Sequence, residues 1–336
     1  MCTASSWAQA RQKLTCKKCG EQFSVDSDVI IFRSKPVDKA SKFHDISGGP
    51  KFTGVQFADN PQVYSANRIY AKYLDQWFQL RRGTVLDLGC GDGRLSLWAL
   101  NAGFPLVVAV DSNIVSLQRL VRQAVAIKVS DRLLPICAAA QDFCLKESAF
   151  DLVLCFEVLY YLTRNGQNRS KWLIYLRTLL SSQGKVVLSE FCRLGRLLAD
   201  VVAMNVENMG MTARAGTRLE KFQNHRMKVS HPTSVELLKD CEASGFKILD
   251  KKGVSPVSML FHYAHTFTSY PLRPALGPDL KRTIDLLEDS TSEVSELSRN
   301  IVLLLKSNKF SQSKHGGARK REKSSRVQSR LHRSSR

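Results

Sequence analysis

An apolar segment that runs directly into three alternating glycines constrains the fold of this chain more than any other feature. The segment reads Val85-Leu86-Asp87-Leu88-Gly89-Cys90-Gly91-Asp92-Gly93-Arg94. Glycine lets the backbone approach a ligand where a β-carbon would collide, and a helix that begins near Gly93 offers unpaired N–H groups to that ligand. A pyrophosphate-binding loop usually reads G-x-G-x-x-G, whereas this loop reads D-x-G-x-G-x-G. The pattern therefore predicts a strand, a ligand-binding turn and a helix.

The rest of the chain predicts a doubly wound α/β sheet around this unit. Short apolar runs recur along the sequence, and the segments between them carry apolar residues at helical spacing. The expected strands are 85–88, 106–111, 133–138, 150–157, 184–191, 246–249 and 300–305. The expected helices are 68–80, 113–126, 171–180, 233–245 and 272–288.

Acidic residues accompany the first three expected strands. Asp87 lies in the first, Asp111 ends the second, and Asp142 follows the third. Each acid alone has a simpler interpretation as a strand-end, helix-cap or turn residue. Three acids at successive strand ends favour one shared crevice, because open α/β sheets bind ligands outside the carboxyl ends of their strands. In order and spacing, residues 65–307 resemble the class I S-adenosylmethionine-dependent methyltransferases.

This resemblance implies a Rossmann-like sheet of seven strands with strand seven antiparallel, and S-adenosylmethionine as the cofactor. It places Asp87 near the cationic amino group of the cofactor, Asp111 at the ribose hydroxyls, and Asp142 with the backbone N–H of Phe143 at the adenine. The full set of expected cofactor-binding residues is Asp87, Gly89, Gly91, Gly93, Asp111, Asp142, Phe143 and Glu157.

The residues after the fourth expected strand bear on the methyl acceptor. They read Phe156-Glu157-Val158-Leu159-Tyr160-Tyr161, which also resembles the corresponding motif of the family. No N-P-P-Y or D-P-P-Y occurs there, which argues against methyl transfer to the exocyclic amines of adenine and cytosine. The polar groups expected nearest the acceptor are Glu157, Tyr160, Tyr161, His225 and His231. His231 is the candidate general base, although a histidine at a helix entrance is more often a packing or capping residue.

These features favour an enzyme that methylates a small molecule whose identity the sequence does not reveal. One alternative is an RNA or ribonucleoprotein acceptor, which a basic stripe leading from the crevice would favour. A second alternative is a non-catalytic scaffold that binds the cofactor, which an acceptor side without polar groups would favour.

The N-terminal segment, residues 1–50, resembles the small zinc-ribbon-like segment that precedes the catalytic domain in several methyltransferases. Cys16 and Cys19 form a C-x-x-C-G pattern, and 29–32 is expected to form a short strand. A structural zinc site needs four ligands, usually from two such pairs, and the sequence holds no second C-x-x-C. Cys2 and His44 are the only nearby candidates. We therefore favour a degenerate ribbon that packs without metal over a zinc site.

Residues 51–308 form the expected methyltransferase domain, and residues 309–336 form a basic tail. The tail holds four lysines and six arginines against one glutamate, so it supplies +9 of the net charge of +20. Its composition predicts disorder, because it has too few large apolar residues to offset the entropy of ordering. Such a tail attracts polyanions and resembles a nuclear localisation patch at 319–323, or it serves only to keep the protein soluble.

Composition fits an intracellular protein of 336 residues with one sizeable core. Hydrophobic residues make up 43% of the chain, and no apolar run approaches the length needed to span a bilayer. The N-terminus lacks the hydrophobic core of a signal peptide. Several cysteines, namely Cys90, Cys137, Cys155 and Cys192, fall in the glycine loop or in apolar runs, as expected for reduced thiols. We expect a cytoplasmic location, with the nucleus as the alternative in a eukaryote. The oligomeric state is left open.

Overall fold

The computed structural model describes most of the chain between the N-terminal strands and the last strand of the sheet. The described residues are 7–10, 13–16, 22–32, 61–79, 82–140, 145–163, 168–202, 205–222, 225–254, 282–283, 286–287, 298 and 300–308. Asp142, Phe143 and Cys19, the basic tail and almost all of the expected helix 272–288 lie outside them.

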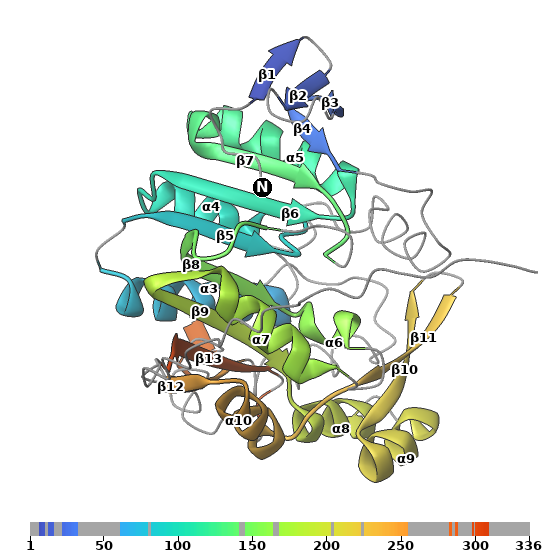
Figure 1. The fold of residues 1–336 in the computed structure, drawn as a ribbon. Helices are drawn as coiled ribbons and strands as arrows, with labels where there is room; N and C mark the ends of the chain where they lie inside the picture. The colour runs from blue at the N-terminus through green and yellow to red at the C-terminus, as the bar shows by residue number, and fades with distance from the viewer. Residues whose placement is uncertain are drawn as a thin grey trace, which may run out of the picture.

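The seven expected strands form one mixed sheet, and their order confirms the predicted fold (Figure 1). Their bounds are β5 (Thr84–Leu88), β6 (Leu106–Asp111), β7 (Leu133–Cys137), β8 (Phe150–Phe156), β9 (Leu180–Phe191), β12 (Phe246–Val254) and β13 (Asn300–Ser307). They are ordered β7-β6-β5-β8-β9-β13-β12. The first five pair in parallel, while β13 pairs antiparallel with both β9 and β12.

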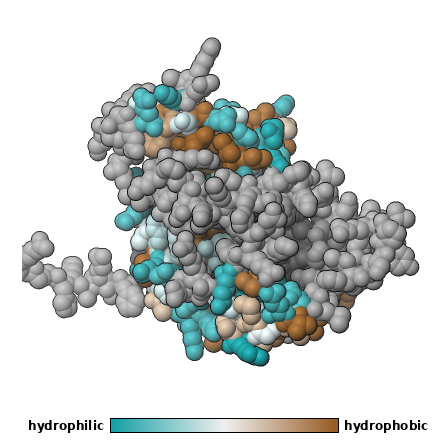
Figure 2. Space-filling model, turned by 90° about the vertical axis from the view of Figure 1, so that its right-hand side faces the viewer, coloured by the Kyte–Doolittle hydropathy of each residue, from teal (hydrophilic) through white to brown (hydrophobic). Residues whose placement is uncertain are grey.

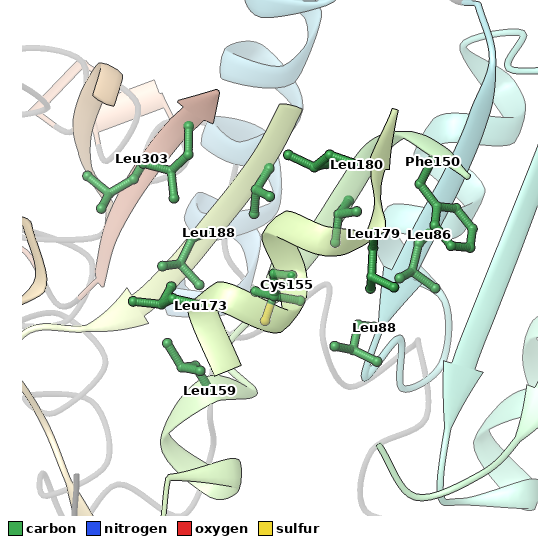
Figure 3. Packing of buried hydrophobic residues seen from close by; sticks show 14 of the residues in the cluster. Leu86, Leu88, Phe150, Cys155, Leu159, Leu173, Leu179, Leu180, Leu188 and Leu303 are labelled. Carbon is green, nitrogen blue, oxygen red and sulfur yellow. The ribbon is translucent and has the colours of Figure 1, made fainter. Parts of the chain in front are cut away.

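Helices cover both faces of this sheet. On one face lie α3 (Pro61–Trp77), α4 (Arg94–Asn101) and α5 (Ile114–Ala126), which share buried apolar clusters with alternate residues of the strands. On the other lie α6 (Leu159–Leu162), α7 (Arg169–Leu179) and α10 (Ser234–Ala243). Figure 3 shows Leu173 of α7 near Leu188 of β9, and Leu179 of α7 near Leu86 of β5, all within one buried cluster. Successive side chains of a strand point to opposite faces of the sheet, so alternate residues of each strand pack against the two sets of helices.

Local sequence signals explain where two of these helices begin. Asn113 caps α5, because its side-chain oxygen accepts hydrogen bonds from the backbone N–H groups of Val115 and Ser116. Thr233 and Glu236 form a reciprocal capping box at the start of α10, as the sequence predicts. Gly245 follows the helix with φ 83°, a conformation that suits glycine.

The N-terminal residues continue the same sheet beyond β7. The strands β1 (Trp7–Ala10), β2 (Lys13–Cys16), β3 (Gln22–Asp26) and β4 (Val29–Ile31) form an antiparallel meander. β4 pairs in parallel with β7, so the described sheet has eleven strands. Val29 is fully buried in a cluster with Leu117 and Leu120 of α5. The boundary at residue 50 between a ribbon-like domain and the catalytic domain stays a prediction.

Between β9 and α10 the chain adds two helices and a hairpin that the sequence analysis did not anticipate. We call these elements the insertion: α8 (Arg193–Val202), α9 (Val206–Ala215), β10 (Thr217–Phe222) and β11 (His225–Ser230). Asp200 of α8 forms a buried ion pair with Arg218 at 3.1 Å and accepts a hydrogen bond from Thr212 at 3.1 Å. Figure 1 shows the insertion beside the carboxyl ends of β8 and β9.

Figure 2 shows the edge of the molecule at which the parallel strands end, where described hydrophilic and hydrophobic residues are interspersed. Within the described part of the chain, no helix has the length and apolar character required to cross a membrane.

Candidate active site

The glycine loop joins β5 to α4 at the carboxyl edge of the sheet. Gly89, Gly91 and Gly93 all have positive φ, at 72°, 53° and 83°. A β-carbon on Gly89 would lie 2.2 Å from the side chain of Val158, and one on Gly93 would lie 2.2 Å from Leu120. Around Gly91, by contrast, no heavy atom of the described residues lies within 4 Å of such a β-carbon, its two chain neighbours apart. Two glycines therefore serve close packing within the protein, while the third leaves open space over the backbone.

Asp87 lies beneath this loop and not at its surface. Its carboxylate is only 2% exposed and accepts a hydrogen bond of 2.6 Å from the hydroxyl of Ser96 on α4. Burial raises the pKa of Asp87 to about 6, while the Ser96 hydrogen bond and the charge of Arg94 hold it down. Asp87 thus ties strand β5 to the helix that follows the loop. Its direct contact with the amino group of the cofactor stays a prediction.

Asp111 ends β6 and faces the glycine loop. Its Oδ2 accepts a hydrogen bond of 2.8 Å from the backbone N–H of Gly91, and its Oδ1 accepts one of 2.8 Å from Asn113. The residue is partly buried, and each carboxylate oxygen retains capacity for a further donor. The structure therefore brings Asp111 and the glycine loop together. That Asp111 binds the ribose hydroxyls of the cofactor stays a prediction.

The thiol of Cys90 lies in the same loop. Burial raises its pKa well above the ordinary value, and the charges of Asp111 and Asp87 raise it further. Cys90, Cys137, Cys155 and Cys192 are all buried, and none of them forms a disulfide with a described residue. Cys90 is thus a neutral, apolar component of the loop.

Glu157 follows β8, and its side chain is bonded by side chains from two other elements, α3 and β13. Its Oε1 accepts hydrogen bonds from the hydroxyl of Tyr70 at 3.2 Å and from Nδ2 of Asn300 at 3.0 Å. The hydroxyl of Ser189 lies 3.0 Å from that of Tyr70. The sequence reasoning missed Tyr70, Ser189 and Asn300, because partners 87 to 143 positions from one another give no local signal.

Tyr160 and His231, both expected near the acceptor, meet in one aromatic group. The ring of Tyr160 lies 4.0 Å from that of Tyr161, 5.0 Å from Phe191 and 5.5 Å from His231. Val229 of the insertion is buried against Tyr160 and Phe191. The side chain of His231 is completely buried, which favours the packing interpretation, and its role as a base stays a prediction. The side chain of His225 lies outside the described set.

Glu190, which the sequence analysis did not single out, is buried next to this group. It is 1% exposed and precedes Phe191 at the end of β9. Burial raises its pKa to about 8, and the nearby charge of Glu157 raises it further, whereas the backbone N–H of Phe191 and the charge of Arg169 lower it. Glu190 is therefore largely protonated at neutral pH. The sequence signal that could have identified Glu190 is the alternating pattern of the strand, which places this acid at a core-facing position.

The N-terminal cysteine pair is described only in part. Cys16 ends strand β2, and Cys19 lies outside the described residues. Among the residues that the structure does describe, no three His, Cys, Asp or Glu side chains gather as a metal site would require. Whether Cys16 and Cys19 bind zinc stays a prediction.

Taken together, the strand order and the glycine loop define a class I methyltransferase fold. The sequence model described as methyltransferase domain matches residues 63–251, more than half of the chain. The chain belongs to this methyltransferase family. It is an S-adenosylmethionine-dependent methyltransferase, and S-adenosylmethionine is its cofactor.

The solved structures that are similar to the chain include the following three proteins. A protein from Pyrococcus horikoshii OT3 is 16% identical, with 77% of this chain and 95% of that chain covered and a TM-score of 0.49. A putative S-adenosylmethionine-dependent methyltransferase from Listeria monocytogenes is 15% identical, with 73% and 99% covered and a TM-score of 0.49. The 1,6-didemethyltoxoflavin-N1-methyltransferase from Burkholderia thailandensis is 15% identical, with 90% and 99% covered and a TM-score of 0.46. No curated protein sequence matches the chain.

Proposed function

We propose that this enzyme transfers the methyl group of S-adenosylmethionine to a small-molecule acceptor. The observation that carries the proposal is the placement of the insertion at the carboxyl ends of β8 and β9. Val229 of β11 packs on Tyr160 and Phe191, and the backbone N–H of His231 bonds to Gly216 at 2.8 Å. An insertion packed onto the acceptor side encloses that side, which suits a compact acceptor better than a folded RNA.

The residues at the glycine loop fit the cofactor. The open space over Gly91 can accept a ligand against the backbone, and α4 begins directly after the loop with no side-chain cap on its first N–H groups among the described residues. We assign to Asp111, whose carboxylate accepts from the backbone N–H of Gly91, the hydrogen bonds from both ribose hydroxyls. The assignment of Asp142 and Phe143 to the adenine stays a prediction, since both lie outside the described residues.

The chemistry needs mainly orientation and exclusion of water. When bound, the cofactor supplies an electrophilic methyl group on a positively charged sulfur. The chain has to hold the nucleophile in line with the bond that breaks, because a fixed near-attack geometry removes much of the entropic barrier. We assign Tyr160 and Tyr161 to the wall against which the acceptor lies. The buried aromatic group around them contributes by keeping water away from the reacting atoms.

The test is transfer of label from S-adenosylmethionine with a tritiated methyl group. The protein is incubated with three fractions of a cell extract: a filtrate of small molecules, total RNA, and proteins. We expect label in the filtrate, and mass spectrometry of the labelled species then identifies the acceptor. Label in RNA would favour the nucleic-acid alternative. Cofactor binding without label in any fraction would favour the scaffold.

A further inference from the structure

We propose that Tyr70, Ser189 and Asn300 are positioning residues that hold the carboxylate of Glu157 for the α-ammonium group of the cofactor's methionine end. The inference rests on the proposed function, because it presupposes that S-adenosylmethionine lies over the glycine loop. Beyond the expectation that Glu157 contacts the cofactor, it assigns Glu157 to the same amino group as the prediction for Asp87, as a second carboxylate, and it names the residues that fix the geometry of Glu157.

The first step is the geometry around Oε1 of Glu157. The Tyr70 hydroxyl and the Asn300 amide both donate to this one oxygen, at 3.2 and 3.0 Å. The hydroxyl of Ser189 connects the two donors, at 3.0 Å from Tyr70 and 3.5 Å from Asn300 Nδ2. Tyr70, Ser189 and Asn300 are all buried. Side chains from three elements of the fold, α3, β9 and β13, therefore converge around one carboxylate oxygen.

The second step is the charge that remains. The two side chains that donate to Glu157, Tyr70 and Asn300, are neutral, as is Ser189 behind them. Within the described part of the chain no lysine or arginine forms an ion pair with Glu157. The described residues also place no hydrogen-bond donor on its Oε2. Glu157 is only partly buried, so a bound ligand can donate to this second oxygen. A cation that donates hydrogen bonds would complete the site, since charge-assisted bonds are the strong ones.

The third step is the location of Glu157. Its φ of 58° is a strained value for a residue with a β-carbon, and strain of this kind is kept where the surroundings impose it. The next residue, Val158, packs so closely on Gly89 that a β-carbon there would lie 2.2 Å away. Glu157 thus stands directly beside the start of the glycine loop. Arg94, the first residue of α4, lies over the ring of Tyr70 at 5.1 Å from its centroid.

The fourth step is the choice between the two cationic groups of S-adenosylmethionine. The sulfonium carries no hydrogen that can be donated, whereas the α-ammonium carries three. The hydrogen-bonding pattern at Glu157, with one saturated oxygen and one open one, matches a donor. The α-ammonium is therefore the group that we assign to it.

The experiment compares three ligands by isothermal titration calorimetry. S-adenosylmethionine has both cations, S-adenosylhomocysteine keeps only the ammonium, and 5′-methylthioadenosine has neither. In Glu157→Gln we expect affinity for the first two ligands to fall about tenfold or more, and affinity for methylthioadenosine to stay unchanged. In Tyr70→Phe the same pattern is expected with a loss of about three- to tenfold, because the carboxylate keeps its charge but loses one of the two donors that fix it.

Tyr73→Phe is the matched control. Tyr73 lies on the same helix, is also buried, and donates its hydroxyl to the carbonyl of Gly253 at 3.1 Å. It should bind all three ligands like the parent. Ser189→Ala provides a second variant if Tyr70→Phe unfolds, with a smaller loss of the same pattern.

The outcomes separate the claims. A loss in Glu157→Gln confined to S-adenosylmethionine would assign the carboxylate to the sulfonium and overturn the inference, as would an equal loss for all three ligands. A Tyr70→Phe variant that binds like the parent, or a Tyr73→Phe variant that loses as much, would overturn the positioning role. These results leave the methyltransferase assignment intact. A parent that binds none of the ligands would overturn both.

Discussion

Ser96 on α4 donates its hydroxyl to Asp87 in β5 at 2.6 Å, directly beneath the glycine loop. Asp87, the acid of the D-x-G-x-G-x-G pattern, thus stabilises the loop by bonding the strand before it to the helix after it. The two residues lie nine positions apart, and the loop between them contains all three glycines. Because the carboxylate is buried, this one hydrogen bond matters more than a surface contact would.

Ser96→Ala should lower the free energy of unfolding by about 1 to 3 kcal/mol at pH 7, because a buried carboxylate loses a donor. Urea denaturation followed by circular dichroism measures the change. Ser116→Ala on α5 is the control: Ser116 is also buried, and the backbone N–H that it donates to Asn113 survives the substitution. A Ser96 variant as stable as the parent would show that the bond contributes nothing.

Gly91→Ala should separate cofactor binding from folding. The new β-carbon enters open space, so the fold survives with about 1 to 2 kcal/mol of strain from its φ of 53°. The same atom occupies the place that we assign to the cofactor, so affinity for S-adenosylmethionine should fall more than tenfold.

Gly103→Ala is the control for Gly91→Ala, since Gly103 also combines a positive φ, at 94°, with free space around a β-carbon. Gly103 lies after α4, away from the loop. Its variant should lose stability but keep its affinity. Equal affinities of the two variants would contradict the placement of the cofactor over Gly91.

Glu190 should make the enzyme less stable as the pH rises. Its pKa in the folded state is about 8, above the ordinary value of 4.5, so its stabilising contribution is present in full below pH 4.5 and is lost as the pH rises through 8. The loss amounts to roughly 1.4 kcal/mol for each pH unit within that window. Glu190→Gln removes this dependence. Urea denaturation of both proteins at pH 6, 7 and 8 measures it, and parallel curves for the two would contradict the account.

The strand order could be predicted from the sequence because each strand has a signal in its own local sequence. Asp111, for example, closes an apolar run of the right length, and Asn113 caps the following helix. The insertion could have been recognised in part. Leu194, Leu197, Leu198 and Val201 fall at helical spacing, and Gln223-Asn224 separates two strands that pair in register.

The contacts that build the site could not be predicted in this way. Tyr70 was expected only as part of a helix, and nothing in its neighbourhood indicates that its hydroxyl reaches Glu157. That pairing depends on α3 and Ser189 sharing one face of the sheet, which is a property of the packed fold. The parallel pairing of β4 with β7 was not predicted for the same reason, since it depends on the packing of Val29 against α5.

Removal of the chain beyond Asn308 tests the role of the basic tail. The last strand, β13, ends at Ser307, so folding and affinity for S-adenosylmethionine should be unchanged in the shortened protein. Methyl transfer to the small-molecule fraction should also persist across a salt series. A large loss of transfer at moderate salt, with a salt dependence reduced by about 0.7 to 0.9 per lost phosphate contact, would indicate an RNA acceptor instead.

Calorimetric titration of the parent and of Asp111→Ala with S-adenosylmethionine and with NAD tests the central claim most directly. The account predicts that the parent binds S-adenosylmethionine and not NAD. It predicts that Asp111→Ala binds S-adenosylmethionine at least tenfold more weakly, because hydrogen bonds between a carboxylate and the ribose hydroxyls are lost. A parent that prefers NAD, or an Asp111 variant with undiminished affinity for S-adenosylmethionine, would contradict it.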